Sequence, residues 1–171
     1  LEGQEVIDLY FYLSEVIDKN KNAKGGENYT DAQAALDDLM LKLQLLKCEE
    51  VLPKAEEKFK NNPDDLDALA GLYQQLRAAK CACEPVLLDI AEKLNESEAD
   101  LSKAKLLASC ASNAGDYSKA LKYYKQALDL ATDDEEKAEF SLSIAKIYQS
   151  MNDYPTARSY ALKAASLKSG W

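Results

Sequence analysis

The chain has 171 residues, of which 47% are hydrophobic and 30% are charged, so it can bury a core and keep a polar surface. Thirty acidic residues outnumber 21 basic ones, and the formal net charge is −9. This balance excludes the basic surface that nucleic-acid binding requires. No apolar run approaches the ~20 residues of a membrane-spanning helix. Six glycines and four prolines in the whole chain favour helices over strands.

Helical spacing of apolar residues runs along most of the chain. A first helix is expected near residues 4–19, with an apolar face suited to cap one end of a helical stack. Residues 20–28, which include Gly25 and Gly26, form the stretch that looks most like a linker. Beyond it the pattern predicts helices near residues 30–46, 49–60, 66–79, 84–95, 101–113, 117–130, 136–150 and 154–168.

Capping residues mark several of these helix starts. Thr30 or Asp31, Asp116 and Asp153 are the expected N-caps, because their side-chain oxygens can accept hydrogen bonds from the first backbone N–H groups. Pro155 would fall in the first turn of a helix, where a missing N–H costs little.

Two segments of the chain repeat each other. The segment from Gly115 to Ala120 aligns with the segment from Asn152 to Ala157, and the two alanines are 37 residues apart. The first helix of each unit carries small or apolar residues spaced 3, 1 and 3 apart, which places them on one face. These residues are Ala104, Leu107, Ala108 and Ala111, then Ser141, Ile144, Ala145 and Tyr148, and earlier Leu69, Leu72, Tyr73 and Leu76, and Leu36, Leu39, Met40 and Leu43. The second helices carry small residues that let two helices approach closely, at Ala120 and Ala127 and at Ala157 and Ala164.

Residues 101–134 resemble the tetratricopeptide repeat family, whose signature they match at Gly115, Tyr117, Ala120, Tyr124 and Ala127. Residues 138–168 match less fully. There Asn152 replaces the glycine, which suits a left-handed turn conformation, and Ala161 replaces the aromatic residue. Residues 32–100 match loosely.

The resemblance implies an all-α fold, a right-handed α-solenoid of antiparallel helix pairs. It divides the chain into an N-terminal capping helix and linker (1–28), degenerate helix pairs (29–100) and two well-matched units (101–171), after which a further repeat would begin.

The family resemblance also implies a function in protein–protein interaction. Such proteins typically hold an extended or helical peptide on the concave face built from the first helices. The residues at the corresponding positions are Asp67, Gln74, Arg77, Ser102, Lys105, Ser109, Ser112, Glu139, Lys146 and Gln149. Chaperone-tail binding is not expected, because Ser109 stands where those relatives need Asn. A purely structural spacer in a larger assembly, and a small-molecule or glycan binder that uses exposed tyrosines, remain alternatives.

The residue inventory argues against catalysis. The chain has no histidine, no Gly-rich phosphate loop and no nucleophile elbow, so we expect no enzyme and no cofactor. Cys81 and Cys83 are separated by one residue, which is too close for the usual zinc-ligand spacing, so no metal is expected either. The repeat pattern predicts core positions for Tyr73, Tyr117, Tyr124, Tyr148 and Tyr154, whereas Tyr10, Tyr12, Tyr123 and Tyr160 are less constrained.

The four cysteines suggest one disulfide. Cys48 and Cys81 fall at the open end of a predicted helical hairpin whose turn lies near Pro63, and such ends allow the short Cα separation that a disulfide needs. Cys83 is the competing partner, and two unlinked thiols are the alternative. Cys110 is expected to be buried and unpaired. A disulfide would favour an extracytoplasmic, periplasmic location and a likeness to exported bacterial proteins of this repeat type.

Overall fold

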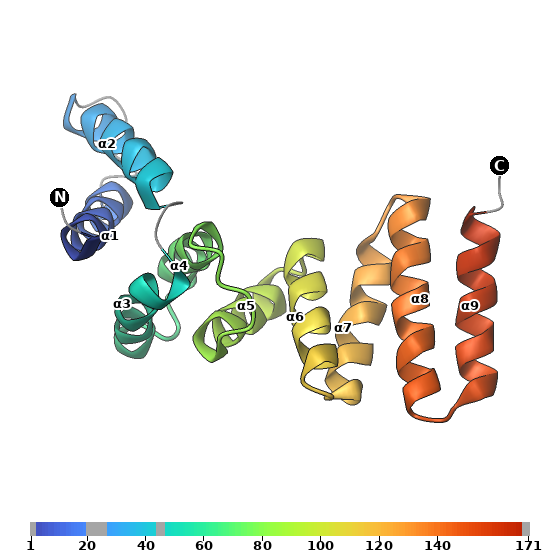
Figure 1. Ribbon diagram of the computed structural model, residues 1–171. Coiled ribbons are helices and arrows are strands. Elements are labelled where there is room, and N and C mark those ends of the chain that lie inside the picture. Colours follow the sequence, from blue (N-terminus) through green and yellow to red (C-terminus); the bar gives the residue numbers. More distant parts are fainter. Residues whose placement is uncertain (1–2, 20–26, 44–46, 169–171) are drawn as a thin grey trace. The chain divides into compact units, whose positions relative to one another are not determined.

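The computed structural model describes residues 3–19, 27–43 and 47–168, and this part of the chain consists of helices joined by turns, without a strand (Figure 1). The fold is all-α, of the α-solenoid class, and the helices predicted from the sequence are present. They are α1 (Gly3–Lys19), α2 (Glu27–Leu43), α3 (Cys48–Asn61), α4 (Leu66–Ala78), α5 (Pro85–Ser97), α6 (Leu101–Asn113), α7 (Tyr117–Leu130), α8 (Asp134–Ser150) and α9 (Tyr154–Lys168).

The chain divides into two compact units, Leu1–Ile90 and Ala91–Trp171, and the division falls inside α5. In unit 1, α1 packs on α2 and α3 packs on α4, with smaller contacts between α1 and α3 and between α2 and α4. In unit 2, α6 packs on α7, α7 on α8, and α8 on α9. Figure 1 shows α8 and α9 side by side and antiparallel, as expected for a helix pair joined by a short turn.

Small residues sit at the helix contacts of unit 2. Ala120 and Ala127 of α7 are fully buried, and so is Ala104 of α6. Phe140 of α8 fills the space beside Ala104 and Ala127, and Ile144 packs in a second cluster with Ala120. A methyl group on one helix therefore faces a large side chain on the next, which lets the helices interdigitate at the density of a protein interior.

Helix ends in both units share one turn geometry. Lys80, Gly115 and Asn152 have φ values of 62°, 79° and 63°, and each follows the last turn of a helix. In each case the N–H of the next residue bonds back to a carbonyl five residues earlier, at 2.9 to 3.0 Å, which closes the helix C-terminus. The left-handed conformation inferred for Asn152 is confirmed. Lys80 occupies the same conformation in unit 1, although its sequence gives no such signal.

The predicted N-caps meet different outcomes. Asp116 accepts a hydrogen bond from the Lys119 N–H at 3.0 Å, and Asp153 accepts one from the Thr156 N–H at 3.2 Å, so both caps are confirmed. The caps predicted at Thr30 and Asp31 are wrong, because α2 begins at Glu27 and both residues lie within its first two turns.

Unit 1 is built around α1 and α4. Buried apolar residues of α1 (Val6, Ile7, Tyr10, Phe11 and Ile17) form one face of that helix, as its apolar pattern predicts. Leu69, Leu72, Tyr73 and Leu76 are the buried apolar residues of α4. The predicted linker at residues 20–28 lies outside the described residues except for its last two positions, which belong to α2.

The tyrosines differ from expectation at one signature position. Tyr73 is buried, and Tyr117, Tyr124 and Tyr148 pack against the core of unit 2. Tyr154 does not, because 61% of its side chain is exposed at the first turn of α9, where its hydroxyl group donates to Asn152. Of the less constrained tyrosines, Tyr10 and Tyr123 are buried, Tyr160 stacks on Tyr148, and Tyr12 is 62% exposed.

Candidate functional site

The outer surface of α6 and α8 carries seven of the residues proposed for partner binding. Lys105 and Glu139 link the two helices through an ion pair of 3.5 Å between Nζ and Oε1, and both side chains are about half exposed. The Lys105 ammonium also lies 5.8 Å from the centroid of the Phe140 ring. The seven residues are exposed or half-exposed: Ser102, Lys105, Ser109, Ser112, Glu139, Lys146 and Gln149. We call this set the α6–α8 surface.

Packing beneath the surface fixes the spacing of these side chains. Ala104 packs with Phe140, and Ala111 packs with Ile144, so the two helices share a core along their length. Lys105, Ser112 and Glu139 are adjacent in sequence to these buried residues, and their side chains lie on the exposed side of the two helices. Leu142, 37% exposed, is a large apolar side chain in the same stripe of α8, between Glu139 and Lys146.

The serines of this surface differ in how their hydroxyl groups are engaged. Ser109 donates to the Leu106 carbonyl at 3.1 Å, and Ser143, on the adjoining edge of α8, donates to the Glu139 carbonyl at 3.1 Å. Their oxygen lone pairs remain able to accept hydrogen bonds. A surface with serine acceptors, two lysines, a carboxylate, an amide and one leucine can bind both polar and apolar groups of a polypeptide.

The other three predicted residues belong to unit 1. Asp67, Gln74 and Arg77 are exposed on α4. Arg77 donates from one terminal guanidinium nitrogen to the Cys81 carbonyl oxygen at 2.8 Å, which ties it to the end of its own helix. These residues form a separate polar stripe on α4.

A polar cluster at α5 and α7 was not anticipated from the sequence. The Tyr123 hydroxyl donates to the Glu92 carboxylate at 3.3 Å, and Lys119 pairs with the same carboxylate. Burial, and then the charge and hydrogen bond of Glu92, raise the pKa of Tyr123 to about 12. Next to it, the Asn95 amide donates to the Gln126 side-chain oxygen at 2.8 Å. These bonds join α5 to α7 and hold their facing sides together.

A second polar contact joins α7 to α8. Lys125 donates to the Tyr148 hydroxyl at 2.9 Å, and this hydrogen bond raises the pKa of the Lys125 ammonium, against the opposing effect of burial. The Tyr148 ring stacks on Tyr160 at a centroid distance of 5.8 Å. The spacing of residues along one helix cannot predict such contacts, because they depend on how separate helices pack together.

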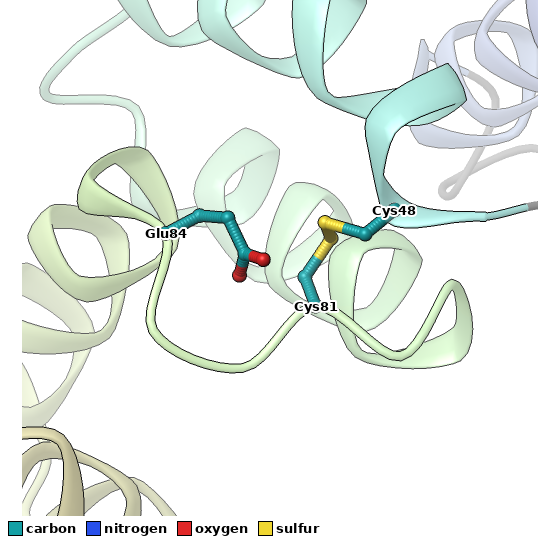
Figure 2. A group of neighbouring side chains, drawn as sticks. All are labelled: Cys48, Cys81 and Glu84. Carbon is teal, nitrogen blue, oxygen red and sulfur yellow. A yellow bond between two sulfur atoms is a disulfide. The ribbon is translucent and has the colours of Figure 1, made fainter.

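Cys48 and Cys81 form a disulfide across the α3–α4 hairpin, with a Cα–Cα distance of 5.0 Å (Figure 2). Glu84 points its carboxylate toward the bridge, and the two sulfurs and a carboxylate oxygen lie within 4.8 Å of one another. This grouping has the residue types of a metal site. Both sulfurs are, however, shared in the disulfide, and the Glu84 carboxylate accepts the Ala82 N–H at 2.7 Å. The oxidised site therefore offers no thiolate ligands.

The expectation that Cys110 is a free thiol is wrong. Cys110 is buried, as predicted, but both Cys83 and Cys110 are disulfide-bonded, and no described cysteine is free. The helix position of Cys110 correctly indicated burial. It did not report which cysteine elsewhere in the chain would come within bonding distance.

Comparisons with known proteins agree with this architecture. Residues 88–169 match the family described as tetratricopeptide repeat. No curated protein sequence matches the chain. The solved structure MamA MSR-1 C2 is 17% identical, with a TM-score of 0.57, over 96% of this chain and 92% of that one. MamA AMB-1 P212121 is 16% identical, with a TM-score of 0.60, over 98% and 90%.

At these identities the structural likeness concerns the fold alone. The family match covers the last part of α5 and all of α6 to α9, which are the helices that carry the duplicated small-residue pattern and the α6–α8 surface. None of the described helices combines the length and apolar character that crossing a bilayer requires. Residues 88–169, just under half of the chain, are therefore a region of tetratricopeptide repeats.

Proposed function

We propose that the protein is an interaction module that binds a segment of another protein on the α6–α8 surface. The observation that carries this proposal is the ion pair between Lys105 and Glu139, which brings the exposed stripes of two successive repeats together as one surface. Exposed pairs of this kind contribute about 0–1 kcal/mol to stability, so a partner can replace either member at little cost.

The side chains of the α6–α8 surface indicate which kind of polypeptide segment can bind there. Lys105 and Lys146 suit carboxylates or backbone carbonyls, and Glu139 suits a cation or a backbone N–H. Leu142 is the apolar anchor. A polypeptide that combines polar groups with one apolar side chain meets these demands. Asp67, Gln74 and Arg77 of α4 are proposed to serve the same role in unit 1.

Site-specific photo-crosslinking tests this proposal in the native organism. A photoreactive amino acid at Ser102 or Gln149 is expected to capture one protein partner, whereas the same probe at Lys122, exposed on α7, is expected to capture none. Charge reversal at Lys105 should reduce the crosslink yield at Ser102. Equal capture at all three positions would contradict a specific role for the α6–α8 surface.

The alternatives predict other outcomes. A spacer in a larger assembly would crosslink through helix ends or loops and not through Ser102 or Gln149. A glycan or small-molecule binder would place exposed tyrosines together. The described tyrosines with the largest exposure are Tyr12 and Tyr154, at 62% and 61%, and each is the single exposed tyrosine described in its own unit. The protein-binding proposal is therefore the one that the described surface favours.

The disulfides bear on where this function operates. A bond between Cys48 and Cys81, with Cys83 and Cys110 also oxidised, suits an oxidising compartment, and we place the protein outside the cytoplasm, in a periplasm. Alkylation of protein trapped in its native cells should find no free thiols before reduction and four after it. Four alkylated cysteines before reduction would refute this location.

A further inference from the structure

A groove of about 510 Å³ opens in unit 1 between α1, α3 and α4. Its volume lies within the range of ~300–1000 Å³ that is typical of ligand sites. One side is a stripe of α4 made of Ala68, Gly71, Leu72 and Gln75, which follow helical spacing. The space beside Gly71 is open, since a Cβ atom added there would meet no atom within 4 Å. A larger side chain at this position would enter the groove. The groove lies on helices other than those of the α6–α8 surface.

Gln75 lines this groove, and its side-chain oxygen accepts no hydrogen bond. It is 4% exposed, and its Oε1 has no hydrogen-bond partner. Its Nε2 donates to Ser14 Oγ at 3.5 Å, and the Ser14 hydroxyl donates to the Tyr10 carbonyl at 3.0 Å. Because the single Ser14 proton is used, Ser14 accepts from Gln75 Nε2 in this arrangement, and Gln75 Oε1 is left without a donor. Leaving a buried acceptor unpaired is costly, so the site favours a ligand that donates.

The charged side chains around the groove also favour a ligand that carries hydrogen-bond donors. Lys19 is committed to Glu15 at 3.0 Å, and Lys58 lies 4.5 Å from the centroid of the Phe11 ring. Hydrogen bonding to Lys19, together with the charges of Lys19 and Lys58, lowers the pKa of Glu15. In contrast, the exposed Asp67 carboxylate pairs with no residue in the described part of the chain.

We propose that this groove receives an arginine side chain from a protein partner, which donates to Gln75 while the Asp67 carboxylate on the same helix attracts its charge. A guanidinium carries five N–H donors and no acceptor, it is weakly hydrated, and its apolar stem can cover Phe11 and Leu72. Gln75 is held by one long hydrogen bond, so its amide can turn toward the bound group. The net charge of −9 supports approach of a cationic segment.

The test is a titration of the oxidised full chain, labelled with ¹⁵N, with the peptide acetyl-Gly-Arg-Gly-amide. Saturable shifts are expected at the Gln75 side-chain amide and at the backbone amides of Ser14 and Gly71. The matched peptide with citrulline in place of arginine has the same shape and no charge, and it should bind more weakly. Absence of saturable shifts at these groups would overturn the proposal, and so would equal binding of both peptides.

Two variants locate the binding. Gly71→Leu fills the groove without a clash at Cβ and raises helix propensity, so it should fold and lose the response. Ala70→Leu places the same side chain on the exposed neighbouring position and should keep the response. Asp67→Asn leaves the groove open and should weaken arginine binding roughly 2- to 5-fold. An unchanged response in both Gly71→Leu and Asp67→Asn would overturn the proposal. The α6–α8 crosslinks do not depend on it, so the two proposals fail separately.

Discussion

Loss of the Cys48–Cys81 disulfide should destabilise unit 1 selectively. The bond joins residues 33 positions apart. On the chain-entropy model, opening a loop of that length lowers the free energy of unfolding by about 4 kcal/mol. Total stabilities of small domains are about 5–15 kcal/mol, so the bond supplies a large share of what holds the α3–α4 hairpin together. The double substitution Cys48→Ser and Cys81→Ser removes it without leaving a lone thiol.

Hydrogen exchange followed by mass spectrometry resolves where this loss falls. A decrease of about 4 kcal/mol corresponds to amide exchange roughly 10³-fold faster in α3 and α4, if those helices exchange by opening of unit 1. Peptides from α8 and α9 belong to unit 2 and serve as the internal control, because their exchange should be unchanged.

Two results would refute this reasoning. Exchange in α3 and α4 that changes by less than about 10-fold would show that packing alone holds the hairpin, or that the unfolded chain keeps it compact. Equal acceleration in α8 and α9 would show that the two units unfold together, and the stability of one would then depend on the other.

Three further substitutions test the packing and the electrostatics. Ala120→Leu overpacks a fully buried position and should cost about 1–3 kcal/mol in urea unfolding, and an unchanged midpoint would contradict its place at a helix contact. Lys80→Gly should add about 0.5–1 kcal/mol, because Lys80 has φ 62° and glycine adopts that conformation without strain; a lower melting temperature would count against this. The pKa of Tyr123 is about 12 in the folded protein and about 10 in the unfolded chain. The contribution of Tyr123 to the free energy of unfolding is therefore complete below pH 10 and is lost between about pH 10 and 12. Tyr123→Phe should flatten that part of the stability–pH curve, and an unaltered curve would exclude Tyr123 as its source.

The sequence was most informative where local signals and tertiary packing agree. In residues 101–168, Asp116 and Asp153 begin helices and Gly115 and Asn152 end them, and most predicted boundaries in that region coincide with the observed ones. At α2 no such agreement exists. The apolar spacing begins near residue 36 and Thr30 is a good N-cap by type, yet the helix continues back to Glu27. The capping preference of Thr30 alone does not set the start of α2, because the residues before it can also adopt helical conformation.

Features that depend on contacts between helices could not be predicted. Burial of the Gln75 Oε1 atom without a donor, and the hydrogen bond from Tyr123 to Glu92, both depend on the arrangement of separate helices. The same holds for oxidation of Cys110, whose spacing indicated only a buried side chain. For the α6–α8 surface, spacing predicted which residues would be exposed, but not the ion pair between Lys105 and Glu139.

The two units differ at equivalent repeat positions of α4 and α6. In α6, Ala104, Ala108 and Ala111 are small, so the neighbouring helices pack closely against them. In α4 the corresponding positions hold Leu69, Tyr73 and Leu76. These positions of α4 carry larger side chains, and on the adjoining stripe of α4 the groove beside Gly71 is open. The disulfide closes the α3–α4 hairpin at its open end, and on the chain-entropy model this link adds stability to that supplied by packing.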